Sequence, residues 1–442
     1  MARRDLTQGH ITEHFVSLTI PMILGILGLV AFNLADTYFV GKLGTTQMAA
    51  LTFTFPVVLL LNSLNLGLGI GASAIISKAF GQKDHQAVKE LSSYSILLGF
   101  TFALIASFIG LITIKPVFSL LGADQSVFPY IKDYMSIWYL GVPFVVIPMI
   151  GNSIIRALGD TKVPSMVMML AAVTNIILDP IFIFGLGPVP AFGVKGAAIA
   201  TVLSRSITFS TALYILIHRE KVVSFKIIKI KSIIPIWKKI LYIALPNAAS
   251  RMILPIGLGI ITGLISTYGL DAIAGYGIAT RVEYFALAIS QALASVIPVF
   301  VGQNFGAGDF DRIKEGIRIS RKFMLSFNAG LYLILFIAGP WLIGLFTVNT
   351  QVIKIAVLYL RIVPLAYGFQ GIILVLNGAL NALHKPVVAA SLNLIQMLVI
   401  YVPMAVILNR YFGVTAIFAS LAFSYLVVAI MGNKAFKKIL VD

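Results

Sequence analysis

The stretch FGQKD at residues 80–84 returns in the second half of the chain as FGAGD at residues 305–309. The same offset in residue number, called the main offset below, links three further pairs: Pro21 with Pro246, Gly44 with Gly269, and Asn152 with Asn377. A slightly shorter offset relates the FGV triplets of residues 192–194 and 412–414. Self-similarity over so long a period predicts that the two halves of the chain carry the same fold.

The composition shows which solvent this fold needs. Of the 442 residues, 59% are hydrophobic and only 11% are charged, whereas a soluble domain has about 25% charged residues. The mean hydropathy of +0.99 excludes a soluble fold, because one water-facing shell cannot enclose so much apolar surface. Stretches near the roughly 20 apolar residues that span a bilayer occur twelve times. We predict spans at residues 15–39, 48–77, 91–114, 129–155, 163–184, 194–217, 240–267, 272–302, 317–337, 352–380, 387–408 and 414–431.

The 33 Lys and Arg residues outnumber the 16 Asp and Glu residues, giving a formal charge of +17. With the N-terminus inside, most of these cations fall in cytoplasmic loops, among them Arg3, Arg4 and the basic run of residues 219–239. We therefore expect a multi-pass protein of the cytoplasmic membrane with both termini inside. Because the cations are spread over many short loops, they do not form a nucleic-acid surface.

Each half contains six spans, so both halves enter the membrane from the same side and the repeat is parallel. We predict an all-α polytopic membrane protein: twelve transmembrane helices in two six-helix bundles, related by a pseudo-two-fold axis around a central cleft. The N-terminal lobe takes residues 1–217, a cytoplasmic linker residues 218–239, and the C-terminal lobe residues 240–442. This architecture is typical of alternating-access transporters.

An ionisable side chain inside a membrane span raises the free energy of insertion, so each one is a candidate for a functional or structural role. Asp36 in the first span and Asp179 in the fifth both fall in the outer half of the membrane, and Thr201 in the sixth reaches a similar depth. Asn175 shares a helix face with Asp179, and Pro180 predicts an irregular backbone beside it. These oxygen ligands suit a proton or Na⁺. A purely structural role, in which the acids hold helices together, is the alternative.

The remaining intramembrane charges are interpreted as interhelical partners in preference to substrate contacts: Arg205, Arg251, Arg281, Glu283 and Arg361. The chain has no cysteine, all five histidines fall in loops or tails, and no GxxxxGK[ST] motif occurs. We therefore expect no enzyme activity, no cofactor, and no metal site beyond a possible Na⁺ at the polar group of the N-terminal lobe.

The sequences Asn33-Leu34-Ala35-Asp36 and Leu178-Asp179-Pro180-Ile181-Phe182, together with the paired FG loops, resemble the multidrug and toxic compound extrusion (MATE) family, most closely its DinF-like branch. The resemblance implies export of bulky, often cationic and aromatic compounds in exchange for inward H⁺ or Na⁺. It also implies an ion site in the N-terminal lobe, a bend of the first helix at Pro21, and Tyr139 and Asn152 as neighbours of the site. The implied ion-site residues are Asp36, Asn175, Asp179 and Thr201.

One feature departs from the related NorM-like branch, which carries acids in the seventh and tenth helices. Here those helices hold Arg251 and Arg361, so we do not expect that branch's C-terminal ion site. The same superfamily contains lipid-linked oligosaccharide flippases, and the intramembrane arginines keep this alternative open. We expect a monomer in the lipid bilayer whose partners are small organic molecules.

Overall fold

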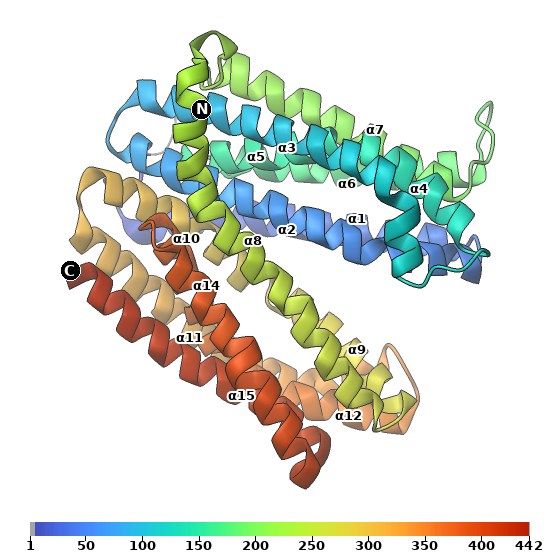
Figure 1. Ribbon diagram of the computed structural model, residues 1–442. Coiled ribbons are helices and arrows are strands. Elements are labelled where there is room, and N and C mark those ends of the chain that lie inside the picture. Colours follow the sequence, from blue (N-terminus) through green and yellow to red (C-terminus); the bar gives the residue numbers. More distant parts are fainter. Residues whose placement is uncertain (1–4, 442) are drawn as a thin grey trace. The chain divides into compact units, whose positions relative to one another are not determined.

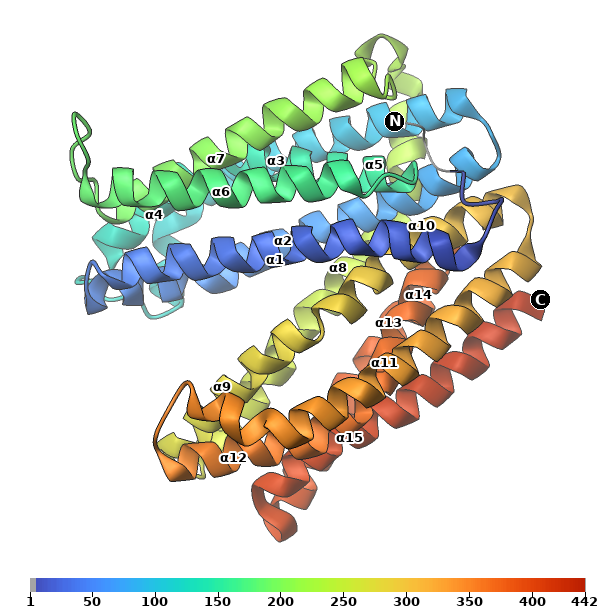
Figure 2. The same cartoon turned by 180° about the vertical axis from the view of Figure 1, so that it is seen from behind.

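The structure is a computed structural model that describes residues 5–441, apart from the side chains of Asn33, Thr45 and Val441; Arg3 and Arg4 therefore lie outside the described part. The described chain is built almost entirely of helices (Figure 1). The first half contains α1 (Ile11–Gly41), α2 (Thr45–Gly81), α3 (His85–Leu120), α4 (Phe128–Leu140), α5 (Val142–Ala157), α6 (Lys162–Phe184) and α7 (Val194–Tyr214). The second half contains α8 (Ile230–Ser266), α9 (Leu270–Ala286), α10 (Ala288–Ala307), α11 (Phe310–Gly344), α12 (Thr350–Ile362), α13 (Tyr367–Ala382), α14 (Pro386–Leu394) and α15 (Val402–Val441); Figure 2 shows them from the other side.

These helices supply twelve membrane spans. Ten segments are individually long and apolar enough to cross a bilayer, and the pair α4 and α5, bent by 48°, makes an eleventh. The segment Pro386–Leu440 counts once among the ten, although 55 helical residues would extend about 80 Å, far beyond a hydrocarbon core of about 30 Å. Gly413, with φ 62° and ψ −152°, breaks the helix inside this segment and divides it into two spans. The predicted all-helical fold with twelve spans is confirmed.

The chain divides into two compact units, each with its own packed helices. Unit 1 comprises Met1–Asp5 and Ile20–Leu245, and unit 2 comprises Leu6–Thr19 and Pro246–Asp442. The start of α1 thus belongs to unit 2, whereas the sequence had suggested one lobe from residue 1 to residue 217. Hydrogen bonds explain this assignment, because the backbone of Leu6 accepts from Arg312 Nε (3.0 Å) and donates to Gln303 Oε1 (3.0 Å).

The segment predicted as a polar linker is partly ordered against unit 1. Lys229 and Tyr94 of α3 exchange two hydrogen bonds, in which the tyrosine hydroxyl accepts from the Lys229 amide (2.7 Å) and donates to its carbonyl (3.0 Å). Val222 and Val223 are buried, and α8 already begins at Ile230. The connection between the halves is therefore an ordered segment that packs against α3 and is followed by α8.

The repeated FG motif forms the same turn in both halves. After α2 the backbone of Lys83 has φ 59°, and after α10 Gly308 has φ 77°, a region that glycine adopts with least strain. The aspartate that follows then caps the next helix: Asp84 accepts from the Ala87 amide and Asp309 from the Arg312 amide, at 2.8 and 2.9 Å. The sequence repeat is thus a repeat of helix–turn–cap geometry.

A third aspartate, Asp124, stabilises the turn that precedes α4, outside the predicted spans. Asp124 is exposed and accepts hydrogen bonds from the Ser126 hydroxyl (2.6 Å) and from the backbone amides of Ser126 and Val127 (2.8 and 3.2 Å). These donors stabilise the carboxylate and hold the pKa of Asp124 below its ordinary value.

Candidate functional site: the buried acids of unit 1

Asp36 and Asp179 lie at corresponding positions on two helices. Each residue is five residues from the end of its helix, α1 or α6, and both helices run in the same direction through unit 1 in the predicted topology. Asp179 is completely buried, and Asp36 is half-buried with its Oδ1 atom enclosed. The two carboxylates interact electrostatically. The structure thus brings together the two acids that the sequence singled out.

Asn175 is the hydrogen-bond donor of this pair. Its Nδ2 atom donates to Asp179 Oδ1 at 3.0 Å, one helical turn away, as the spacing of four residues predicted. The predicted irregular backbone at Asp179 is wrong, because α6 continues through Pro180 to Phe184. Proline removes one amide from the helical ladder, and α6 tolerates this loss while it packs against α7.

Three buried oxygen atoms of this group have no hydrogen-bond partner within the described part of the chain: Asp36 Oδ1, Asp179 Oδ2 and Asn175 Oδ1. All three are acceptors. Buried polar atoms are nearly always satisfied, and an acceptor without a donor costs about 1–3 kcal/mol. A cluster of unpartnered acceptors around two acids has the chemistry to bind a proton or a hard cation. No group of three or more His, Cys, Asp or Glu side chains suitable for a metal occurs among the described residues, so amide or hydroxyl ligands would have to complete a cation site.

Thr201 is placed near this level by the tight junction of α6 and α7. The amides of Phe192 and Gly193 donate to the last carbonyls of α6 at 3.0 Å. A Cβ atom at Gly196 would lie only 2.1 Å from the carbonyl oxygen of Phe182, so glycine is required for this approach. Thr201, one to two turns further along α7, is 7% exposed.

Two further residues belong to the group although the sequence did not assign them to it. Tyr134 of α4 is buried and interacts electrostatically with both aspartates and with Arg205. Arg205 lies one turn beyond Thr201 on α7, and its guanidinium carbon is 4.7 Å from the centre of the Phe32 ring on α1. Arg205 is thus an interhelical partner as predicted, through an aromatic ring. Its spacing of four residues from Thr201 was the available signal.

The other predicted neighbours are not brought into this group. Tyr139 is buried at the end of α4, where its ring fills the space above Gly110 of α3. Asn152 lies on α5, which begins after the 48° bend that follows α4, and its buried Oδ1 has no hydrogen-bond partner among the described residues. Pro21 lies within α1, which is helical from Ile11 to Gly41, two residues after the segment that belongs to unit 2.

The four charged residues singled out in the spans of unit 2 form no ion pair among the described residues: Arg251, Arg281, Glu283 and Arg361. Arg251, Arg281 and Arg361 are exposed on the surface of the unit, and Arg361 lies over the ring of Phe336 at 5.2 Å. Glu283 is half-buried and accepts a hydrogen bond from the hydroxyl of Tyr359. Arg361 and Glu283 thus contact neighbouring helices through aromatic residues. Arg251 and Arg281 are exposed at the surface of unit 2.

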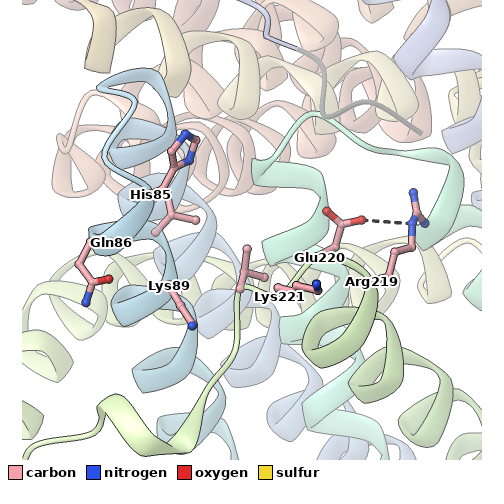
Figure 3. Close-up of a pocket in the computed structure, with 8 residues that line it drawn as sticks. His85, Gln86, Lys89, Arg219, Glu220 and Lys221 are labelled. Atoms are coloured by element: carbon pink, nitrogen blue, oxygen red, sulfur yellow. Dashed lines mark ion pairs between the residues drawn. The ribbon is translucent and has the colours of Figure 1, made fainter.

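A cavity of about 600 Å³ lies elsewhere in unit 1, between the start of α3 and the turn after α7 (Figure 3). Charged side chains dominate its wall, and Arg219 forms ion pairs with Glu220 (3.3 Å) and with Asp160 (3.2 Å). None of the predicted ion-site residues lines it. Its lining consists of His85, Gln86, Val88, Lys89, Arg219, Glu220, Lys221 and Val222.

Comparison with known proteins identifies the class to which this fold and site belong. The family model described as MatE matches residues 21–181 and 246–407, one segment in each half of the repeat. The chain therefore belongs to the MATE family of transporters, as the sequence motifs indicated.

Individual relatives extend over nearly the whole chain. The FAD transporter of Shewanella oneidensis is 37% identical over 431 residues, which cover 97% of this chain and 95% of that protein. The multidrug export protein MepA of Staphylococcus aureus is 30% identical, with 91% and 88% covered. The crystal structure of the Vibrio cholerae MATE transporter VcmN in the bent form has a TM-score of 0.91 at 28% identity, with 97% of both chains covered.

Proposed function

We propose that this transporter is a secondary antiporter that exports bulky, often cationic organic compounds in exchange for inward H⁺ or Na⁺. The observation that carries the proposal is the set of three unpartnered buried oxygens around Asp36, Asn175 and Asp179. A structural pair of acids would have its oxygens satisfied by donors. These atoms instead leave a place for a positively charged species.

Both coupling ions are compatible with the chemistry of the group. A proton needs only one carboxylate oxygen, whereas Na⁺ needs several oxygen ligands, which Asp36, Asn175, Asp179 and Thr201 can supply. Tyr134, which interacts electrostatically with both aspartates and with Arg205, adds a phenol hydroxyl to the group. Separate pH and Na⁺ gradients therefore distinguish the two ions.

The relatives support two classes of exported compound. Multidrug export by MepA supports organic cations, which aromatic side chains attract. The name of the Shewanella relative supports a second candidate, an anionic flavin dinucleotide. Arg251, Arg281 and Arg361, exposed in the spans of unit 2, offer the positive charge that phosphates require and therefore favour this candidate.

We further propose that the protein resides as a monomer in the cytoplasmic membrane with both termini inside. The support is the concentration of Lys and Arg in the loops of one side. It requires no resident cofactor, since the coupling ion supplies the driving force. Alternating access then exposes the substrate to the two sides in turn.

The test is transport by the purified protein in liposomes under an imposed pH gradient, an imposed Na⁺ gradient, or neither. We expect export of a cationic dye, of FAD, or of both to follow one of the gradients and to stop when an ionophore collapses it. Movement of a fluorescent lipid-linked oligosaccharide without export of either compound would identify a flippase instead. Export that ignores both gradients would refute the antiport.

A further inference from the structure

The acid of unit 2, Glu283 on α9, lies in a cluster of tyrosines from five structural elements. Its carboxylate accepts a hydrogen bond from the hydroxyl of Tyr359, which is 1% exposed. Four other tyrosines interact with it electrostatically. The cluster consists of Tyr276 (α9), Tyr359 (α12), Tyr367 (α13), Tyr401 (in the π-helical turn Ile395–Tyr401) and Tyr425 (α15).

The internal repeat relates this cluster to the acid group of unit 1. The main offset, which relates the two FG motifs, equates Tyr134 with Tyr359. Tyr134 interacts with the two aspartates of unit 1, and Tyr359 interacts with Glu283 of unit 2. The shorter offset of the FGV triplets, which applies beyond residue 192, equates Arg205 with Tyr425. A buried tyrosine therefore occupies the equivalent position in both halves. The acids with which it interacts lie on helices that are not equivalent: α1 and α6 in unit 1, and α9 in unit 2.

Within the described part of the chain, no cationic side chain forms an ion pair with Glu283. Arg281 is two residues away on the same helix and therefore on another face, and Arg361 lies over Phe336 instead. Besides the tyrosines, no titratable group among the described residues interacts with the Glu283 carboxylate. An intramembrane carboxylate without a cationic partner is a functional-site candidate by default.

One oxygen atom of the cluster can accept a hydrogen bond from a protonated Glu283. The hydroxyl of Tyr367 is completely buried and has no hydrogen-bond partner among the described residues. While Glu283 is ionised, it can only accept hydrogen bonds, as it does from Tyr359. Once protonated, its carboxylic acid becomes a donor, and a phenol oxygen without a donor is a suitable acceptor.

We propose that Glu283 is a second proton-binding site of this transporter, located wholly in unit 2 and served by Tyr359 and Tyr367. A proton from water adds to the carboxylate, and the same proton leaves when the acid ionises. Close packing around Glu283 leaves room for a proton but not for an organic cation. The aromatic side chains of the cluster are each at most 1% exposed: Tyr359, Tyr367, Tyr401 and Phe418. Half-burial of Glu283 leaves it a route to exchange protons.

The proposal extends the ion coupling proposed above, and infrared difference spectroscopy tests it without any transport measurement. The experiment uses the full-length Asp36→Asn/Asp179→Asn variant in lipid, so that the acids of unit 1 do not contribute. A pH step should produce the C=O band of one protonated carboxylic acid in an apolar environment. Adding Glu283→Gln should remove that band.

Two controls make the assignment specific. Glu315→Gln, on an exposed glutamate of α11 that pairs with Arg318, should leave the band unchanged. Glu283→Asp keeps a carboxyl group and should keep a band, which separates loss of the site from loss of the fold. Tyr359→Phe should shift the band frequency, because the protonated acid loses its hydrogen-bond neighbour, whereas a merely structural tyrosine would leave the frequency unchanged.

A band that survives Glu283→Gln, or a Glu283 that stays ionised throughout the pH range in which the protein is folded, would overturn the proposal. Dye or FAD export by the otherwise unmodified protein under a pH gradient is measured in parallel. Absence of a Glu283 band with intact gradient-driven export would refute only the second site. A clear Glu283 band without gradient-driven export would refute only the antiport.

Discussion

Replacing Asp36 by asparagine should stabilise the protein and abolish its coupled transport. Asp36 lies in a membrane span, and its enclosed Oδ1 atom has no hydrogen-bond donor among the described residues. A buried acceptor of this kind costs about 1–3 kcal/mol, and an ionised one at mid-bilayer about 2.5–3.5 kcal/mol. Asparagine removes the charge at nearly constant volume and adds an N–H donor for the neighbouring acceptors.

We therefore expect Asp36→Asn to raise the free energy of unfolding by about 1–3 kcal/mol. For a folding unit of about 150–250 residues this corresponds to about 2–4 °C per kcal/mol, so the melting temperature should rise by roughly 2–12 °C. Gradient-driven export should fall to the level of protein-free liposomes.

The matched control is Asp133→Asn on α4, which makes the same exchange at a side chain that is 43% exposed. Asp133 forms only a surface ion pair with Lys195 at 3.1 Å. Such a pair contributes about 0–1 kcal/mol, so neither the melting temperature nor export should change appreciably. Melting is followed by intrinsic fluorescence in detergent, and export by dye efflux from liposomes. Full export by Asp36→Asn, or a lower melting temperature with an intact fold, would refute the assignment of Asp36.

Four further substitutions test separate parts of the argument. Thr201→Val keeps the volume and removes a hydroxyl, so it should weaken Na⁺-driven export at least tenfold if Na⁺ is the ion, and leave proton-driven export within twofold. Gly196→Ala should cost about 1–3 kcal/mol in thermal stability because its Cβ would overlap a carbonyl of α6, whereas Gly259→Ala, with open space around it, should cost nothing. Asp124→Ala should lower thermal stability at neutral pH; because the folded pKa of Asp124 lies below its ordinary value, its contribution is present above about pH 4 and lost as the pH falls through the folded pKa, so wild type and variant should melt alike in acid. Pro21→Ala restores a backbone donor within α1 and should slow export while raising the melting temperature, and unchanged export would exclude a bend at this position.

Much of the architecture was predictable because membrane helices are specified by length and hydrophobicity alone. The twelve spans, the two halves and the repeated turn all followed from the sequence, since lipid permits few alternatives to helices. The start of α1 was not predictable in the same way. Its assignment to unit 2 rests on Gln303, Asn304 and Arg312, which hold the backbone of Leu6 from the far half of the sequence. Hydrogen bonds over such separations leave no periodic signal.

The acid group of unit 1 was predictable only where its residues are close together in the sequence. Asn175 and Asp179 are one turn apart on one helix, so their shared face followed from the spacing, and the structure adds the hydrogen bond between them. Tyr134 could not be found by spacing, because a tyrosine in an apolar span has the same pattern as a core residue. The irregular backbone predicted at Asp179 is not formed, because packing of α6 against α7 outweighs the loss of one backbone hydrogen bond.

Equivalent positions in the two halves differ at the acids that the sequence and structure single out. Position 36 of unit 1 holds an aspartate, whereas the position of unit 2 that the main offset makes equivalent holds Ile261, which is completely buried. The same helix therefore packs in both units with or without an acid, so Asp36 is not required to build the bundle. An acid that the fold does not need, and that costs stability where it stands, supports the ion-binding role proposed for Asp36. The same reasoning applies to Glu283, whose equivalent position in unit 1 holds Val58.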